Sequence, residues 1–205
     1  MFMSALHIND FNHMRFVCSA PTPRAFPAPA GPEIAFAGRS NAGKSSALNA
    51  ICGRTGLART SKTPGRTQAI NFFVGEALCF ADLPGYGYAR VPPKTKAAWQ
   101  ALIEHYLGQR EPLAGVVLIM DARRPLTDFD RQLLEWGGAY GLAFHLVLTK
   151  ADKLPRSQQI EALRGVGRRV DGASAQLFSA SKRFGIDEAR ETIAALAYPP
   201  DVDDL

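Results

Sequence analysis

This 205-residue chain is 46% hydrophobic and 21% charged, has a formal net charge of +5, and shows the composition of a globular protein with one sizeable core. It contains no apolar stretch long enough to span a bilayer, and we expect neither a signal peptide nor a membrane or secreted protein. We therefore predict a cytoplasmic location without membrane contact. Three widely spaced cysteines, Cys18, Cys52 and Cys79, are expected to be buried free thiols.

The first residues, 1–32, are predicted to form an N-terminal extension. Their second half, "SAPTPRAFPAPAGP" at residues 19–32, is rich in proline and alanine and cannot be helical throughout. A short strand at residues 15–18 is an alternative left open within this extension. The main domain is expected over residues 33–198, followed by an acidic tail at residues 199–205.

From residue 33 onward, short apolar runs alternate with amphipathic stretches. Strands are predicted at residues 33–38, 70–74, 77–83, 115–122, 143–152 and 175–181. Helices are predicted at residues 44–52, 94–109, 127–141, 157–170 and 185–196. This alternation predicts an α/β, three-layer fold, with a mostly parallel six-stranded sheet and helices on both faces. Ligands of such sheets bind at the carboxyl ends of the strands.

A glycine-rich phosphate loop follows the first of these strands. The stretch matches GxxxxGK[ST] between a predicted strand and a predicted helix, which is the context that the motif requires. Its backbone N–H groups and the helix dipole would bind phosphate oxygens, the lysine would bridge the terminal phosphates, and the serine would ligate Mg²⁺. The residues are Gly38, Arg39, Ser40, Asn41, Ala42, Gly43, Lys44 and Ser45.

A DxxG motif ends the third predicted strand. Asp82 is expected to hold a water bound to Mg²⁺, and the Gly85 N–H is expected to reach a γ-phosphate. Leu83 and Pro84 lie between them in the same loop. The motif is informative because of its place after the phosphate loop, since DxxG also occurs in ordinary turns.

A base-recognition motif ends the strand at residues 143–152. The tetrapeptide Thr149, Lys150, Ala151 and Asp152 fits [NT]KxD. The Asp152 carboxylate would accept hydrogen bonds from guanine N1–H and N2–H₂; adenine lacks these donors, which disfavours an ATPase or kinase. Thr149 replaces the commoner Asn, and its shorter side chain is expected to weaken contacts around N7. Three residues in the second half of the last predicted strand would complete the base pocket: Phe178, Ser179 and Ala180.

Together these motifs resemble those of the EngB family (also called YihA or YsxC), among the Era-like P-loop GTPases. The resemblance rests on "GRSNAGKSS", "SKTPGRTQ", "DLPGYGYA" and "TKADK", and it covers roughly residues 15–197. It implies a cytoplasmic bacterial GTPase that takes part in maturation of the large ribosomal subunit. The family has historically been linked to division septum formation.

The resemblance also implies two switch segments. Switch I would close on the γ-phosphate, with Thr67 as a further Mg²⁺ ligand beside Ser45 and Asp82, and residues 85–91 would form switch II. The expected switch I residues are Gly65, Arg66, Thr67, Gln68 and Ala69.

Hydrolysis is predicted to be slow. Many GTPases carry a Gln after DxxG to orient the attacking water, whereas Tyr86 stands here. Two interpretations of Asn41 remain: it holds a K⁺ ion in place of an arginine finger, as in some Era-like GTPases, or it supports the loop. Arg39 and Arg66 are alternative sources of positive charge. The residues expected to carry catalysis are Lys44, Thr67, Gly85 and Asn41.

The basic residues are unevenly distributed along the chain. Residues 34–75 contain six Lys or Arg and no Asp or Glu, which favours a polyanionic partner such as ribosomal RNA. We therefore expect a monomeric GTP-binding switch that docks on the large ribosomal subunit. The alternative is a nucleotide-dependent adaptor in cell division that acts through a protein partner.

Overall fold

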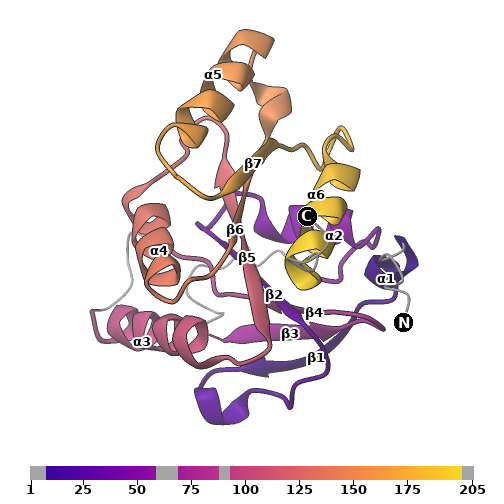
Figure 1. The fold of residues 1–205 in the computed structure, drawn as a ribbon, viewed down its shortest axis with the longest axis vertical. Helices are drawn as coiled ribbons and strands as arrows, with labels where there is room; N and C mark the ends of the chain where they lie inside the picture. The colour runs from indigo at the N-terminus through magenta and orange to yellow at the C-terminus, as the bar shows by residue number, and fades with distance from the viewer. Residues whose placement is uncertain (1–7, 59–68, 88–92, 200–205) are drawn as a thin grey trace.

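The computed structural model describes residues 8–58, 69–87 and 93–199, and it contains a seven-stranded sheet in the order β1-β3-β4-β2-β5-β6-β7 (Figure 1). The strands are β1 (Arg15–Ala20), β2 (Glu33–Gly38), β3 (Ile70–Val74), β4 (Cys79–Asp82), β5 (Leu113–Asp121), β6 (Phe144–Thr149) and β7 (Ser174–Leu177). Strands β4, β2, β5, β6 and β7 run parallel, whereas β1 and β3 add an antiparallel edge. The strands predicted at residues 70–74 and 77–83 are present as the antiparallel pair β3 and β4.

The predicted strand count of six is wrong, because β1 is a seventh strand. It pairs with β3 from Arg15 opposite Val74 to Ala20 opposite Ile70. Most of its side chains are exposed, so this edge strand lacks the continuous apolar run that identifies the inner strands. Phe11, just before it, is buried in the core. The division of the chain at residue 32 remains a prediction.

Helices cover both faces of the sheet, as the α/β interpretation predicts (Figure 1). They are α1 (Ile8–Asn12), α2 (Lys44–Ile51), α3 (Pro93–Gln109), α4 (Asp128–Ala139), α5 (Arg156–Gly167) and α6 (Ile186–Ala197), with short 3-10 turns η1 (Pro23–Ala25) and η2 (Ala151–Lys153). One core contains Leu102 of α3 and Leu133 of α4, and the other contains Leu48 of α2 and Ile193 of α6. The fold is thus a three-layer α/β sandwich.

Alternation along the central strands supplies both cores. In β2, Ala35 lies in the core under α3 and α4, whereas its neighbours Ile34 and Phe36 lie in the core under α2 and α6. Successive side chains of a strand point to opposite faces, so a strand covered on both faces must be apolar throughout. All six residues of β2 are buried, including Glu33, whose carboxylate receives the Tyr106 hydroxyl at 2.6 Å. These layers fix the carboxyl ends of the strands, where the candidate site lies.

The cysteine prediction is confirmed for two of the three residues. Cys52 and Cys79 are buried and free, and burial raises the pKa of the Cys52 thiol to about 12. Cys18 is free but only half-buried, because it lies on the edge strand. Within the described part of the chain, no helix is both long and apolar enough to cross a membrane.

Candidate functional site

The carboxyl ends of β2, β4 and β6 bring the three sequence motifs to one edge of the sheet. The phosphate loop follows β2, the DxxG residues follow β4, and the base-recognition residues follow β6. Phe178, Ser179 and Ala180 follow β7 at the same edge, and Ala69 precedes β3. Four predicted site residues lie outside the described residues: Gly65, Arg66, Thr67 and Gln68.

The phosphate loop needs both of its glycines. A Cβ on Gly38 would lie 2.5 Å from the Ile119 carbonyl oxygen, so any side chain would displace β2 from β5. Gly43 has a φ of +98°, and the N–H of Ala47 donates to its carbonyl at 2.8 Å, which opens α2. Asn41 also adopts a positive φ, of 63°. The loop therefore curls directly into the amino end of a helix, where backbone N–H groups favour an anion.

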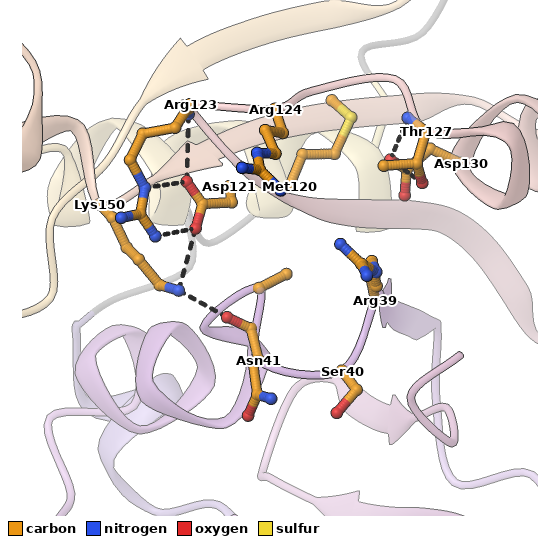
Figure 2. A pocket seen from close by; sticks show the side chains of 11 residues that line it. Arg39, Ser40, Asn41, Met120, Asp121, Arg123, Arg124, Thr127, Asp130 and Lys150 are labelled. Carbon is orange, nitrogen blue, oxygen red and sulfur yellow. Dashed lines mark hydrogen bonds and ion pairs between the residues drawn. The ribbon is translucent and has the colours of Figure 1, made fainter. Parts of the chain in front are cut away.

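Two side chains of the base-recognition motif form hydrogen bonds to the backbone of the phosphate loop. The Thr149 hydroxyl contacts the Ala42 carbonyl oxygen, and it also lies 3.0 Å from the carbonyl oxygen of Met120. The Lys150 ammonium donates to the Asn41 carbonyl oxygen at 2.6 Å (Figure 2). Weaker contacts around N7 remain the prediction for Thr149. In the structure the threonine also connects β5, β6 and the phosphate loop, a role that the motif does not predict.

Asp121 at the end of β5 completes this support, although it belongs to none of the sequence motifs. Its carboxylate accepts from Arg123 at 2.7 and 2.9 Å and from Lys150 at 3.0 Å. Burial alone would raise the pKa of Asp121, but the hydrogen bonds from Arg123 and Lys150 outweigh it and hold the pKa well below the usual range. The anion thus orients Lys150 toward the phosphate loop. An Asp at a strand end was the available sequence signal.

At the other end of the site, the Lys44 ammonium contacts the Asp82 carboxylate. Both side chains are about 90% buried, at 10% and 9% exposure. Asp82 is the last residue of β4, and the N–H of Leu83 donates to the Phe36 carbonyl at 2.9 Å, so β4 stays attached to β2 up to the motif. The residues expected at the terminal phosphates and at the metal therefore lie together.

The oxygen donors present fit Mg²⁺ but do not form a complete protein cage. Ser45 and Asp82 offer a hydroxyl and a carboxylate, which are hard ligands suited to this ion. Among the described residues, no group of three or more His, Cys, Asp or Glu side chains is placed to hold a metal. Such a donor set suits Mg²⁺ that is bound together with substrate phosphates and water.

The DxxG loop lies against the phosphate loop. A Cβ on Gly85 would lie 3.5 Å from the Ser40 backbone, and the Ser40 N–H donates to the Tyr86 carbonyl at 2.7 Å. Pro84 offers its carbonyl to the Trp99 indole N–H at 3.4 Å. That distance is an ordinary van der Waals contact, so the hydrogen bond from Ser40 to Tyr86, rather than the lack of a side chain at Gly85, holds the two loops together.

The side chain of Tyr86 turns away from this junction into the core. Its hydroxyl donates to the Asp130 carboxylate at 2.5 Å, and its ring packs against Trp99 and Phe129. Burial, together with the negative charge of Asp130, raises the pKa of the Tyr86 phenol well above its ordinary value. Asp130 in turn accepts from the Thr127 N–H at 2.7 Å at the start of α4. The phenol therefore fixes the DxxG loop to α4.

The base-recognition residues form a small network between β6 and β7. Asp152 accepts a hydrogen bond from the Ser179 hydroxyl at 2.6 Å, and the Lys153 ammonium lies 3.3 Å from its other oxygen. The bond from Ser179 lowers the pKa of Asp152, so the carboxylate is ionised at neutral pH. The Ala151 N–H donates to the carbonyl of the fully buried Phe178 at 3.1 Å. The anion that would recognise guanine is therefore held in position by its neighbours.

Comparison with known proteins gives a consistent result. Residues 33–150, more than half of the chain, match the family model described as 50S ribosome-binding GTPase. A probable GTP-binding protein EngB of Aromatoleum aromaticum is 50% identical over 197 residues, covering 93% of this chain and 91% of the relative. The corresponding protein of Stenotrophomonas maltophilia is 52% identical over 185 residues, covering 87% and 92%. The chain belongs to the EngB family of GTP-binding proteins.

Solved structures agree with this placement at the level of the fold. A crystal structure of a probable GTP-binding protein EngB matches with a TM-score of 0.67 at 19% identity, covering 80% of this chain and 98% of that one. Era in complex with MgGDPNP and 16S ribosomal RNA matches with a TM-score of 0.65 at 20% identity, covering 80% and 56%. As a member of the EngB family within the GTPases, the chain is a GTP-hydrolysing enzyme with the P-loop GTPase fold.

Proposed function

We propose that this EngB-family protein is a slow GTPase switch, monomeric and cytoplasmic, that acts in assembly of the large ribosomal subunit. The observation that carries the proposal is the convergence of Lys44, Asp82 and Asp152 at one edge of the sheet, at the ends of separate strands. This arrangement supports a site in which the phosphate loop, a carboxylate for the metal and a carboxylate for the base would bind one nucleotide.

Guanine would bind at the Asp152 end. The ionised carboxylate accepts from N1–H and N2–H₂ of the base, and the Ala180 N–H lies in the loop that would donate to O6. Because Ser179 already donates to Asp152 at 2.6 Å, little reorganisation is needed when the base binds. A nucleotide that lacks these donors leaves the carboxylate unpaired, which is the physical origin of the specificity.

The phosphates would bind at the Lys44 end. The loop N–H groups and the Lys44 ammonium neutralise the negative charge of the phosphates, and the Gly85 N–H approaches the γ-phosphate. Ser45, Asp82 and Thr67 would hold Mg²⁺, which neutralises charge that develops on the phosphate oxygens. Since Lys44 contacts Asp82 in this structure, binding of the nucleotide requires Lys44 to exchange that carboxylate for phosphate oxygens.

Slow intrinsic hydrolysis is proposed because the Tyr86 phenol is buried against Asp130. A side chain so placed does not orient an attacking water. Asn41 remains the residue proposed to hold a K⁺ ion, through its side-chain oxygen. Replacing K⁺ with Na⁺ at constant ionic strength tests this role by the turnover rate.

Docking on the large ribosomal subunit is supported by the description of the matched family model as a 50S ribosome-binding GTPase. The test is co-sedimentation of the purified protein with large subunits, in a non-hydrolysable GTP analogue or in GDP, over a salt series. Stronger pelleting with the analogue that weakens steeply with salt is expected. Equal pelleting in both nucleotides, or none, would contradict the proposal.

The adaptor role in cell division requires an apolar docking surface near switch II. Six large hydrophobic side chains are at least about a third exposed among the described residues, and none lies within residues 82–87. They are Phe16, Val17, Tyr140, Ile160, Phe184 and Tyr198. Among the described residues of the DxxG loop, no exposed large hydrophobic side chain supports the adaptor role.

A further inference from the structure

Two adjoining cavities at the carboxyl edge of the sheet are lined by arginines. Of these arginines, only Arg39 belongs to one of the sequence motifs. The first, of about 470 Å³, lies between the phosphate loop and the loop from β5 to α4 (Figure 2). The second, of about 340 Å³, lies between that same loop and α5. Arg123 lines both cavities, so they form one continuous surface, which we call the arginine track. Its arginines are Arg39, Arg123, Arg124, Arg168 and Arg169.

The track carries more positive charge than the protein itself neutralises. Within the first cavity, Asp121 pairs with Arg123 and Lys150. The other acid there, Asp130, is buried and already accepts from Tyr86 and Thr127. These two carboxylates are thus engaged inside the fold.

The remaining arginines of the track have no such partner. Among the described residues, no carboxylate lies within ion-pair distance of Arg39, Arg124, Arg168 or Arg169. All four are exposed. In the second cavity the lining contains a single acid, Glu161. Four guanidinium groups therefore face solvent along one edge, which attracts an anionic partner of some length.

We propose that the arginine track binds the phosphate backbone of RNA. The planar guanidinium fork matches two phosphate oxygens at once, and Arg is the residue best suited to this contact. Neither cavity is lined by an aromatic side chain on which an unpaired base could stack. The recognition is therefore of backbone phosphates in a folded or double-stranded RNA. This inference rests on the proposed ribosomal function, and it names the surface that would perform it.

The track begins beside the nucleotide. Arg39 belongs to the phosphate loop, and its backbone forms an isolated parallel β-bridge with Tyr86 of the DxxG segment. A Cβ on Gly87 would lie 2.9 Å from the Arg39 side chain, so this arginine lies against the start of switch II. RNA bound along the track would contact the phosphate loop through Arg39, and Arg39 in turn lies against Gly87 of the DxxG segment. Through this arginine, RNA binding would be connected to a loop expected to respond to the nucleotide.

The test uses charge reversal of one arginine from each cavity, Arg124→Glu with Arg168→Glu, in the full chain. The matched control, Arg15→Glu with Arg24→Glu, makes the same charge change at exposed residues of β1 and η1. The probe is a short RNA duplex of non-ribosomal sequence, titrated over a salt series. The track variant should bind at least 10-fold more weakly than the control, and the slope of log K against log salt should become shallower by about 1 to 2.

Other measurements separate the possible failures. GTP affinity should be unchanged in both variants, which also shows that they are folded, and Arg124→Gln with Arg168→Gln should give an intermediate loss of duplex binding. If the track variant loses no more affinity for the duplex than the control does, the proposal that the arginine track binds RNA is wrong. Unchanged duplex binding with lost pelleting on large subunits would also overturn it, in favour of an acidic protein partner. If the wild type binds the duplex through the track but never pellets with subunits, the proposed function fails instead.

Discussion

The two ends of the nucleotide site are built differently. At the base end, Thr149 and Lys150 hydrogen-bond to the phosphate loop, and Ser179 orients Asp152. At the phosphate end, the groups intended for ligand and metal, Lys44 and Asp82, contact each other. The hydrogen bonds at the base end can persist when nucleotide binds. The contact between Lys44 and Asp82 at the phosphate end must be replaced by contacts to the nucleotide and the metal.

This difference has an energetic meaning. Hydrogen bonds from Thr149 and Lys150 fix the loop in advance, so less conformational entropy is lost when nucleotide binds. The Lys44–Asp82 pair is about 90% buried, and leaving either charge unpaired in such a site is costly. When the pair separates, the phosphates of the nucleotide must therefore neutralise the Lys44 ammonium, and the metal ion must neutralise the Asp82 carboxylate. We infer that the base end supplies specificity, and that the phosphate end responds to whether Mg²⁺ and phosphates are present.

The largest effect is expected from Asp152→Asn at the base end. GTP affinity should fall by at least about 100-fold, and preference should move to xanthosine triphosphate, because the amide can donate to the xanthine 2-carbonyl. The asparagine oxygen can still accept from Ser179, so the fold should persist. Asp171→Asn at an exposed position is the control. Unchanged GTP affinity, measured by calorimetry, would show that Asp152 does not contact the base.

Thr149→Val tests whether the base end organises the phosphate loop. Removing the hydroxyl, whose single hydrogen faces the carbonyl of Ala42 with that of Met120 nearby, leaves the Ala42 carbonyl without this donor. A loss of about 1–2 kcal/mol should weaken GTP and GDP binding alike, by roughly 10-fold. Thr149→Ser, which keeps the hydroxyl, should restore binding. Equal nucleotide affinities of the valine variant and the wild type would mean that the phosphate loop does not need the hydrogen bond from Thr149.

Tyr86→Phe tests whether the DxxG loop is fixed through the core. The Asp130 carboxylate loses one buried hydrogen bond, so the free energy of unfolding in urea should fall by about 1–3 kcal/mol. Nucleotide affinity should stay within about 2-fold of the wild type. Tyr140→Phe, at an exposed tyrosine, should leave stability unchanged. Slower hydrolysis at unchanged stability would instead place the phenol at the phosphates.

The smallest effect concerns His145 on β6, the strand that ends at Thr149. It is buried and hydrogen-bonds to Ser174 and Gln176 at 2.8 Å, and desolvation lowers its pKa. The unfolded chain therefore binds the proton more readily, and this contribution to stability is present above about pH 6.5 and is lost as the pH falls through the lowered pKa.

Unfolding measured between about pH 7 and pH 5 should thus show a smaller pH dependence in His145→Gln than in the wild type. Only one titrating side chain contributes to the difference, so this effect is expected to be the smallest of the four. His105→Gln, at an exposed histidine, is the control. Identical pH profiles of His145→Gln and the wild type would contradict the assignment.

The sequence was sufficient to predict the layers of the fold and the place of each motif. Strands covered on both faces are apolar throughout, and a ligand site at their carboxyl ends follows from parallel topology. The edge strand β1 is predicted only as an alternative by the sequence, because most of its side chains face solvent. Exposed positions of an edge strand need not be apolar, so they show little of the hydrophobic pattern from which a strand is predicted.

Contacts between the motifs were harder to predict. The Thr149 hydroxyl reaches a loop residue 107 positions earlier, and the Tyr86 hydroxyl reaches Asp130, 44 positions later. Neither separation leaves a periodic signal, because only the tertiary packing brings these residues together. Motif spacing therefore indicates which residues meet the ligand, but it does not indicate which residues hold them.

The most direct test is a pair of crystal structures of the wild-type protein, one without nucleotide and one with a GTP analogue and Mg²⁺. The Thr149 contact to the Ala42 carbonyl and the Lys150 contact to the Asn41 carbonyl should be present in both. The Lys44 ammonium should leave Asp82 in the second structure and bind the phosphates. If the Thr149 contact opens on binding, or if Lys44 stays on Asp82 in the complex, the contrast between the two ends is wrong.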